Sequence, residues 1–292
     1  KVRRYFQRQA EGRTRKIHWI MEFAKKLQER TGKGYLSYSA LKFAADGSKQ
    51  QDMKLFELYM KGLLQKDSQA LTFGSLYDCL LLTPEKVNEQ FAVIEEDAEM
   101  MAKLEKDYKN PRSTKVYKDW FESASNEATN KGLTIVSEED WNQAIEMINR
   151  LDSSQVYDGE NLRMVRSYLE GDSQGEIMSW IGDIPVRGFM DVHGDGFISD
   201  SKTTRSIHGF KYDVFSFCYD IQAYIYTETM GIKDFYWVVQ DKSKPYLCGV
   251  YKASPQTLES GKNKFNSAIR NIQNWLDNPQ MDTEAFAMYG SI

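Results

Sequence analysis

Three short apolar segments joined by two glycine-containing turns constrain the fold of this chain more than any other feature. The segments cover residues 176–182, 185–193 and 197–202, and the turns are Gly182-Asp183 and Gly194-Asp195-Gly196. Glycine beside aspartate in such a short connection is typical of a β-hairpin turn. The pattern therefore predicts three consecutive strands, each antiparallel to the one before it.

The residues that follow these strands predict a mixed α/β fold. Residues 212–230 have the apolar spacing of a helix, and residues 235–241 and 246–252 have the pattern of two further strands. Residues 255–277 then form a predicted closing helix. This order of strands, helix, strands and helix fits a mixed central sheet flanked by helices.

The part of the chain before the strands is predicted to be largely helical. Amphipathic runs cover residues 17–30, 51–65 and 73–83, and Ser39 is a candidate N-cap for a short helix. Residues 98–172 are interpreted as helices joined by polar turns, in which the apolar residues form packing stripes. We therefore expect a helical layer attached to the sheet.

Cysteine usage and hydropathy limit the class of protein. Cys79, Cys218 and Cys248 are widely separated and odd in number, which argues against a disulfide framework and against a four-cysteine zinc or iron–sulfur site. No stretch approaches the roughly 18 apolar residues of a membrane span, and the N-terminal residues lack a signal-peptide pattern. We expect a cytoplasmic protein that does not bind a membrane.

The charge balance means that a polyanionic partner would have to be bound by a local group of basic residues, because the chain as a whole is acidic. The net charge is −4, so the overall field does not attract nucleic acid. A basic cluster near the N-terminus could supply local contacts to DNA, or could be a solvated tail. Its members are Lys1, Arg3, Arg4, Arg8, Arg13, Arg15 and Lys16, with Glu11 among them.

Two aspartates and a lysine in the predicted strands form the candidate reaction centre. Asp191 lies near the end of one strand, while Asp200 and Lys202 lie two residues apart on the next and project from the same face. A hairpin brings Asp191 near Asp200. Two converging carboxylates, with the Ser201 carbonyl as a further oxygen donor, suit Mg²⁺ or Mn²⁺. With Lys202 to orient a water molecule, such a site fits phosphodiester hydrolysis.

A surface ion pair is the alternative interpretation, because Asp-x-Lys is common on strands and an exposed pair contributes little to stability. The neighbouring residues favour the catalytic interpretation. Thr203 follows Lys202 directly, and Gln222 and Tyr226 lie one turn apart on the predicted helix further along the chain. Arg187 and Arg205 flank the centre as candidate phosphate contacts or solvated side chains.

The order of these motifs resembles the PD-(D/E)xK nuclease superfamily. The motifs are Asp191, then Asp200-Ser201-Lys202-Thr203-Thr204, then Tyr219-Asp220-Ile221-Gln222-Ala223-Tyr224. Within the superfamily, the chain is similar to the phage and prophage RecE-type exonucleases, relatives of the RecB nuclease domain and lambda exonuclease. Four further stretches agree, so the resemblance covers roughly residues 35–255. They are residues 35–42, 73–84, 175–180 and 237–240, the last followed by Pro245.

The resemblance implies an α/β fold with a PD-(D/E)xK, restriction-endonuclease-like core. A mixed central sheet is flanked by helices, and the N-terminal part is largely helical. The implied organisation is a basic helical extension over residues 1–34 and a single nuclease domain over residues 35–292, with a helical insertion at about residues 98–172.

The resemblance also implies roles for individual residues. Asp191 and Asp200 would be metal ligands, Lys202 would handle the attacking water, and Glu176 would be a further ligand or a positioning acid. The remaining implied positions bind or brace DNA, and they are Gln222, Tyr226, Arg187, Arg205 and Thr203.

One position departs from the family pattern. Many members carry a histidine in the glycine-led helix where this chain has Asp78. An aspartate there could still bind or orient a metal ion, but it cannot act as a neutral imidazole. Asp78 is therefore a possible additional metal ligand.

The activity implied by the resemblance is a Mg²⁺- or Mn²⁺-dependent exonuclease that digests linear double-stranded DNA in phage-type recombination. The sequence contains no P-loop of the form G-x-x-x-x-G-K-[ST], so we expect no use of ATP. Implied partners are DNA with free ends, a single-strand annealing protein, and further copies of the chain in a ring.

Two alternatives remain open. The first is a Cas4- or AddB-like nuclease of DNA processing, although those proteins usually hold an iron–sulfur cluster through four cysteines and this chain has three. The second is a non-catalytic DNA-binding protein with a decayed site, which the intact Asp191, Asp200 and Lys202 disfavour.

Overall fold

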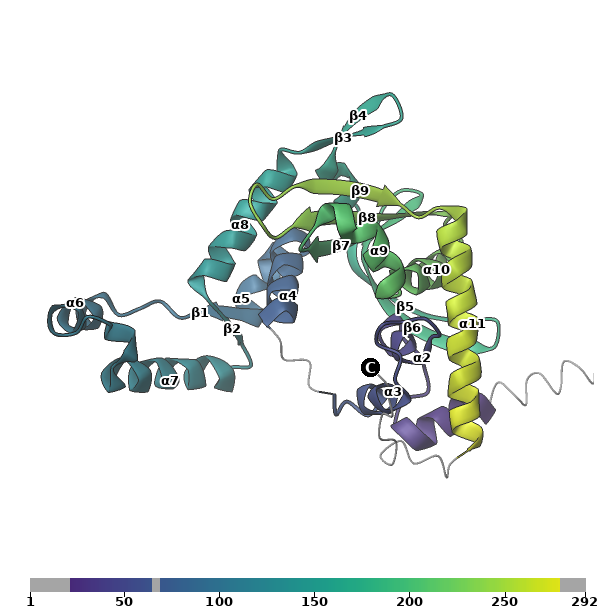
Figure 1. Cartoon of the computed structure of the whole chain (residues 1–292), viewed down its shortest axis with the longest axis horizontal. Coiled ribbons are helices and arrows are strands. Elements are labelled where there is room, and N and C mark those ends of the chain that lie inside the picture. Colours follow the sequence, from purple (N-terminus) through teal and green to yellow (C-terminus); the bar gives the residue numbers. More distant parts are fainter. Residues whose placement is uncertain (1–21, 65–68, 279–292) are drawn as a thin grey trace, which may run out of the picture.

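The computed structural model describes residues 22–64 and 69–278, so the basic N-terminal cluster lies outside the described residues. A five-stranded sheet forms the centre of the molecule, in the order β5-β6-β7-β8-β9 (Figure 1). Neighbouring strands are antiparallel except β7 and β8, which are parallel. The strands are β5 (Asp172–Ile181), β6 (Ile184–His193), β7 (Phe197–Thr204), β8 (Asp234–Asp241) and β9 (Cys248–Lys252).

The parallel step from β7 to β8 requires a helical crossover, since parallel neighbours cannot be joined by a tight turn. The helix predicted over residues 212–230 is in fact two helices, α9 (Phe210–Ser216) and α10 (Tyr219–Met230). They separate at Cys218, whose φ of 60° lies in the left-handed region and interrupts the helical backbone. Helical apolar spacing continues across this break, which is why the sequence suggested one helix.

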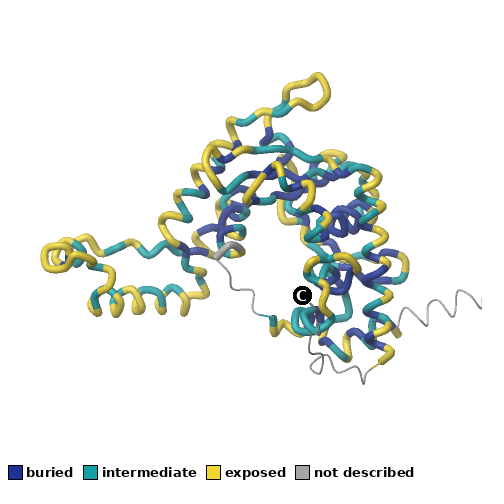
Figure 2. The backbone as a smooth tube through the Cα atoms, in the orientation of Figure 1, coloured by how far each residue is buried: buried dark blue, intermediate teal, exposed yellow. Residues whose placement is uncertain are grey.

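Helices cover both faces of the sheet. On one face, α10 packs with α2 (Tyr38–Ala44) and α11 (Pro255–Asp277) over a core that includes Trp237 and Val239 of β8. On the other face, α4 (Gln69–Leu82) and α8 (Glu138–Asp152) pack over Val238. Because side chains alternate along a strand, β8 contributes to both cores. Figure 2 shows that buried residues are concentrated in the strands and in the helices packed on them.

The short helices near the N-terminus begin at capping residues. α2 is capped by Ser37, whose side chain accepts from the backbone N–H of Ala40, so the predicted N-cap at Ser39 is wrong by two positions. Ser37 has the extended backbone that a capping residue needs, whereas Ser39 is already helical. Asp52 caps α3 (Met53–Met60) in the same way.

Residues 98–172 are not helical throughout. They contain α6 (Ala98–Asp107), α7 (Lys115–Asn130) and α8, but also β2 (Thr134–Val136), which pairs in parallel with β1 (Phe91–Val93). A hairpin of β3 (Gln155–Asp158) and β4 (Asn161–Met164) follows. The short helices in this region are η2 (Pro111–Ser113) and η3 (Val165–Leu169). Three more lie outside it: η1 (Pro84–Lys86), α5 (Val87–Gln90) and η4 (Ile207–Gly209). Strands of three or four residues are too short for their periodicity to be recognised in the sequence.

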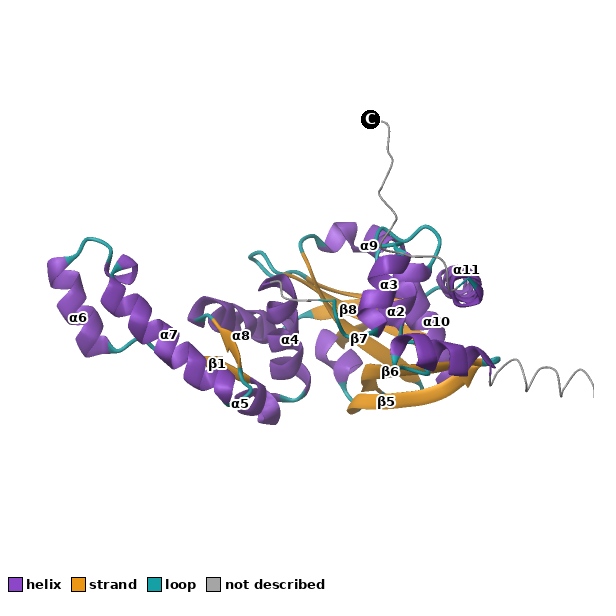
Figure 3. Ribbon diagram, turned by 90° about the horizontal axis from the view of Figure 1, so that it is seen from below, coloured by secondary structure: helices purple, strands orange, loops and turns teal. Residues whose placement is uncertain are grey.

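Helices α6 and α7 form an arm that extends away from the sheet (Figure 3). No residue of α7 is buried, and Leu104 is the buried residue of α6. Within residues 22–64 and 69–278, no helix is long and apolar enough to cross a membrane.

Candidate active site

The candidate site lies where strands β6 and β7 separate. The ladder between them pairs Val192 with Ser199 and His193 with Ile198, next to the turn, and extends no further along the two strands. Further from the turn, Leu36 occupies the edge of β6 and bridges to Val186. The two strands therefore form a fork, and the predicted catalytic residues lie at its base.

A cavity of about 410 Å³ opens at this fork. It brings together side chains from segments that are far apart in the sequence. Among the residues predicted to form the site, those that line the cavity are Asp78, Arg187, Asp191, Asp200, Lys202, Gln222 and Tyr226.

Asp191 is linked to the backbone of β7, on which Asp200 and Lys202 contact each other. Asp191 Oδ2 accepts a hydrogen bond of 2.9 Å from the Ser201 N–H, which joins the two arms of the fork. Lys202 Nζ forms an ion pair with Asp200 Oδ2 and donates to the Ser201 carbonyl at 3.1 Å. Asp200 is 2% exposed, so its charge is balanced inside the protein and not by water.

Helix α10 braces this centre from one face of the sheet. Gln222 Nε2 donates to Asp200 Oδ1 at 2.6 Å, and Tyr226 donates from its hydroxyl to the Phe189 carbonyl at 2.8 Å. The Tyr226 ring lies over Gly188, where an added Cβ would be 2.6 Å from Tyr226 Cε1. In this structure, Gln222 and Tyr226 therefore position the strands.

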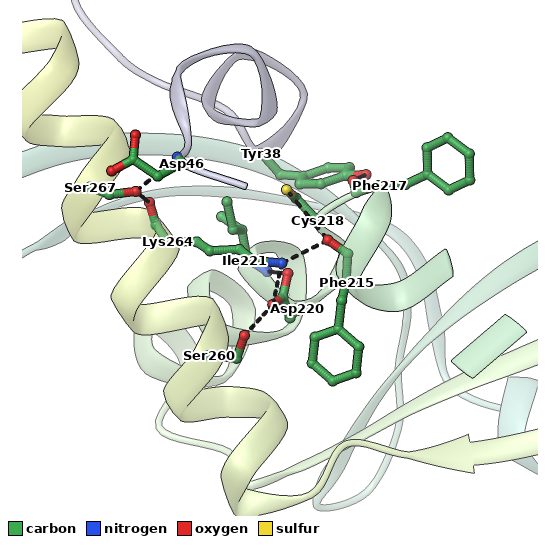
Figure 4. Close-up of polar contacts among 10 residues, drawn as sticks. All are labelled: Tyr38, Asp46, Phe215, Phe217, Cys218, Asp220, Ile221, Ser260, Lys264 and Ser267. Atoms are coloured by element: carbon green, nitrogen blue, oxygen red, sulfur yellow. Dashed lines mark hydrogen bonds and ion pairs between the residues drawn. The ribbon is translucent and has the colours of Figure 1, made fainter. Parts of the chain in front are cut away.

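The start of α10 is fastened to α11 by a buried ion pair (Figure 4). Lys264 Nζ lies 2.9 Å from Asp220 Oδ2, and Ser260 Oγ donates to the same oxygen at 2.7 Å. Lys264 also donates to the Phe215 carbonyl at 2.7 Å, at the end of α9. Because Asp220 is fully buried and lies two residues before Gln222, this contact holds the brace in place.

Burial, together with the crowding of acidic groups, shifts the pKa values of the site. Burial raises the pKa of Asp191 well above its usual range, and the neighbouring Asp200 and Asp78 carboxylates raise it further. Burial also raises the pKa of Asp78 to about 7, although Lys202 acts in the opposite direction. Burial alone would lower the pKa of Lys202, but the Asp200 and Asp191 carboxylates outweigh it and raise that pKa. Lys202 is therefore held as an ammonium group.

The donor groups fit a hard divalent cation. Carboxylate oxygens from Asp78, Asp191 and Asp200 line one cavity, and the Ser201 carbonyl lies beside them. Gln222 Oε1 is buried and has no hydrogen-bond partner among the described residues, so it offers another oxygen. Oxygen ligands of this kind are those that Mg²⁺ and Mn²⁺ prefer.

The three carboxylates are not already gathered around a single point. Within the described part of the chain, no group of three acidic, histidine or cysteine side chains has the arrangement of a metal cluster. Both carboxylate oxygens of Asp200 already have partners, since Gln222 donates to one and Lys202 pairs with the other. A cation held by Asp200 would compete with these contacts.

Four predicted residues do not line the cavity, and one of them is Ser201, whose carbonyl accepts a hydrogen bond from Lys202. Glu176 accepts a 2.7 Å hydrogen bond from Arg187 Nε, and its side chain is 49% exposed. Thr203 faces Gln240 in the register of β7 with β8, and Arg205 is exposed just after β7 ends. Of the predicted DNA contacts, Arg187 is the basic residue that reaches the cavity.

Several cavity residues have no individual role in the sequence-based prediction. Most come from the segment before and within α2, which runs beside β6 because Leu36 exchanges backbone hydrogen bonds with Pro185 and Arg187 at 2.9 and 2.8 Å. The resemblance includes residues 35–42, but the long-range pairing is what brings them here. They are Lys33, Tyr35, Ser37, Tyr38 and Ser39, joined by Tyr59, Met60, Gly188 and Phe189.

A protein-family model described as a PDDEXK-like domain of unknown function matches residues 37–284. The chain belongs to this family. It is therefore a member of the PD-(D/E)xK nuclease superfamily, which confirms the superfamily and the fold class predicted from the motif order.

A solved structure from Eubacterium rectale, described as a candidate exonuclease, shares the fold with a TM-score of 0.58. The match covers 88% of this chain and 90% of that chain at 17% sequence identity. No curated protein matches the chain.

Proposed function

We propose that this PD-(D/E)xK protein is a metal-dependent deoxyribonuclease whose reaction centre is the fork between β6 and β7. The observation that carries the proposal is the contact set at the fork, where Asp191 binds the Ser201 N–H and Lys202 pairs with the buried Asp200. Two carboxylates and an ammonium group in one cavity match the needs of phosphodiester hydrolysis, in which negative charge builds on the phosphate.

Each residue has a defined task in this proposal. Asp191 and Asp200, with the Ser201 carbonyl, would hold Mg²⁺ or Mn²⁺, which supplies charge stabilisation and acidifies a bound water. Lys202 donates hydrogen bonds that orient the attacking water and offset phosphate charge. Gln222 holds the Asp200 carboxylate in a fixed orientation. Asp78 is a further candidate ligand because it lines the same cavity.

The finer proposal is an ATP-independent exonuclease that acts on linear double-stranded DNA in the manner of the RecE-type enzymes. It is supported by the ordered resemblance of the motifs, and the fold is shared with a protein described as a candidate exonuclease. By the same resemblance, we propose a ring of identical subunits, a single-strand annealing protein as partner, and a cytoplasmic location. DNA contacts would include Arg187, while Arg205 and Thr203 would meet DNA outside the cavity.

The test is a nuclease assay on end-labelled linear duplex and on closed circular DNA with Mg²⁺ or Mn²⁺. We expect digestion of the linear substrate alone, with no activity in EDTA. Lys202→Ala should reduce the rate by at least about 100-fold, since general acid–base and charge-stabilising groups each contribute on that scale. Lys252→Ala is a matched control, because Lys252 forms a surface ion pair with Asp234 at 2.8 Å in the same sheet.

Two results would contradict the proposal in different ways. Full activity of Lys202→Ala would remove the assigned reaction centre. Cleavage of closed circles would exclude an exonuclease but leave a metal-dependent nuclease. If the wild-type protein binds linear DNA without cutting it, the non-catalytic alternative is correct.

A further inference from the structure

An exposed row of apolar side chains lies on the outer face of β5 and β6. Met178 is 62%, Trp180 53% and Phe189 49% exposed, although all three are on strands of the central sheet. The register places Met178 opposite Arg187, and Trp180 opposite Pro185. Paired residues share a face of an antiparallel sheet, so these side chains form one surface.

The opposite face of the same two strands is the protein core. Ile177, Val186 and Met190 are at most 4% exposed, and they alternate with the exposed residues along the strands. The outer face is therefore not explained by the packing of the described residues. Surface side chains on an exposed face are normally polar, so a tryptophan and a methionine next to each other suggest a binding surface.

This outer face is continuous with the cavity. Arg187 and Phe189 belong to both, since they line the cavity and lie on the exposed side of β6. The same strand then leads to Asp191, two residues after Phe189. A chain lying along β6 from Pro185, which pairs with Trp180 of β5, would pass Arg187 and Phe189 and arrive at the proposed metal ligand Asp191.

The positively charged Arg187 side chain lies between two aromatic rings, one of them on this outer face. The Arg187 guanidinium is 5.4 Å from the centroid of the Phe189 ring and 5.2 Å from that of Tyr35. Hydrogen bonds to Glu176 at 2.7 Å and to the Tyr35 hydroxyl at 2.8 Å fix its plane. These contacts use two of the five N–H donors of a guanidinium. Aromatic faces interleaved with a basic group are complementary to stacked bases and their phosphates.

We propose that the outer face formed by Met178, Trp180, Arg187 and Phe189 binds the bases of the DNA strand that is being cleaved, in single-stranded form. The strand must be unpaired here, because the flat faces of its bases are available for stacking on Trp180 and Phe189 only outside the duplex. This inference rests on the proposed function and deepens it, since it names the form in which the substrate reaches the fork.

The test measures binding of a fluorescently labelled oligothymidylate in EDTA, where the proposed nuclease does not cut. We expect Trp180→Ala to weaken binding by about 5- to 150-fold, the range found when one base-stacking aromatic is replaced by alanine. Trp180→Phe should retain most of the affinity, because it keeps an aromatic face. Tyr157→Ala is the matched control, since Tyr157 is 79% exposed on the β3–β4 hairpin.

A second measurement separates this inference from the proposed function. In Trp180→Ala, the loss of kcat/KM should be larger with a long single strand than with bis(p-nitrophenyl) phosphate, which is too small to reach Trp180. Unchanged oligothymidylate affinity in Trp180→Ala would overturn the inference. A change in oligomeric state without a change in affinity would overturn it as well, and would identify a protein contact. An inactive wild-type protein that still binds through Trp180 would overturn the proposed function alone.

Discussion

Asp200 is held from two directions, because Gln222 donates to one carboxylate oxygen and Lys202 pairs with the other. Asp191 accepts from the Ser201 N–H, yet burial raises the pKa of Asp191 and of the neighbouring Asp78. In the metal-free protein, ionisation of these two crowded carboxylates destabilises the fold, because nearby positive charge does not fully offset theirs. A bound divalent cation would remove this destabilisation, so metal binding is linked to stability.

Asp78 provides a pH-dependent test of this link. Its pKa is raised from the ordinary 3.8 to about 7, so between these values the folded state holds a proton that the unfolded state has released. The stability of the metal-free protein therefore falls as pH rises through this window. We expect Asp78→Asn to raise the melting temperature in EDTA by clearly more at about pH 8, above this window, than at about pH 5, where only part of the stability has been lost.

Thermal denaturation of both proteins at the two pH values measures the effect. Asp119→Asn on the exposed surface of α7 is the control, and it should leave the melting temperature unchanged at both. An equal gain for Asp78→Asn at both pH values would mean that the carboxyl is not protonated in the fold at low pH.

Helix α10 is held in position by α11 as well as by the sheet. The two helices approach so closely at Gly261 that an added Cβ would lie 2.0 Å from the Asp220 carbonyl oxygen. That contact involves backbone, so it cannot be relieved by turning a side chain. The same turn of α11 carries Ser260 and, one turn further, Lys264, both of which bind Asp220.

Gly261→Ala should therefore destabilise the protein by about 1–3 kcal/mol or more, as overpacking does. It should also lower nuclease activity, because α10 carries Gln222. Gly74→Ala in α4 is a matched control, since no atom lies within 4 Å of an added Cβ at that helical glycine. It should stabilise by up to about 1 kcal/mol. Urea denaturation compares the two, and equal effects would show that α10 and α11 are not in tight contact in solution.

The molecule as a whole has a compact sheet region and an arm that contributes little to either core. Helix α7 buries no residue, and α6 and α7 are separated from the fork by the β1–β2 pair (Figure 1). By contrast, α8 buries Ala144, Met147 and Leu151 against α4. Removing the arm and removing α8 should therefore have very different consequences.

Replacing residues 95–132 by a flexible glycine–serine linker should leave a folded protein that cleaves short linear DNA at a rate close to that of the full chain. Circular dichroism, thermal denaturation and the nuclease assay check this. Met147→Ala is the control for core damage and should cost about 2–5 kcal/mol. An arm deletion that unfolds the protein would show that the arm is part of the fold.

Prediction from sequence succeeded where the determining contacts are local. The predicted strands of the hairpins correspond to β5, β6 and β7, and the predicted closing helix over residues 255–277 is α11, with Ser254 as its N-cap and Pro255 at its first turn. The sequence did not predict the break between α9 and α10 at Cys218, and it placed the N-cap of α2 at Ser39 instead of Ser37. In both places the backbone conformation of a single residue decides where the helix begins. Prediction also failed for β1 and β2, because short strands exist only through their pairing.

The sequence by itself determined that Asp200 and Lys202 share a face of one strand and that a hairpin brings Asp191 near them, since both follow from the two-residue repeat of a strand and the turn between strands. Only the tertiary structure decided that the hairpin opens into a fork, that Asp78 joins it from α4, and that Leu36 occupies the vacated edge of β6. These contacts join residues more than a hundred positions apart. They depend on how whole elements pack, which no local pattern records.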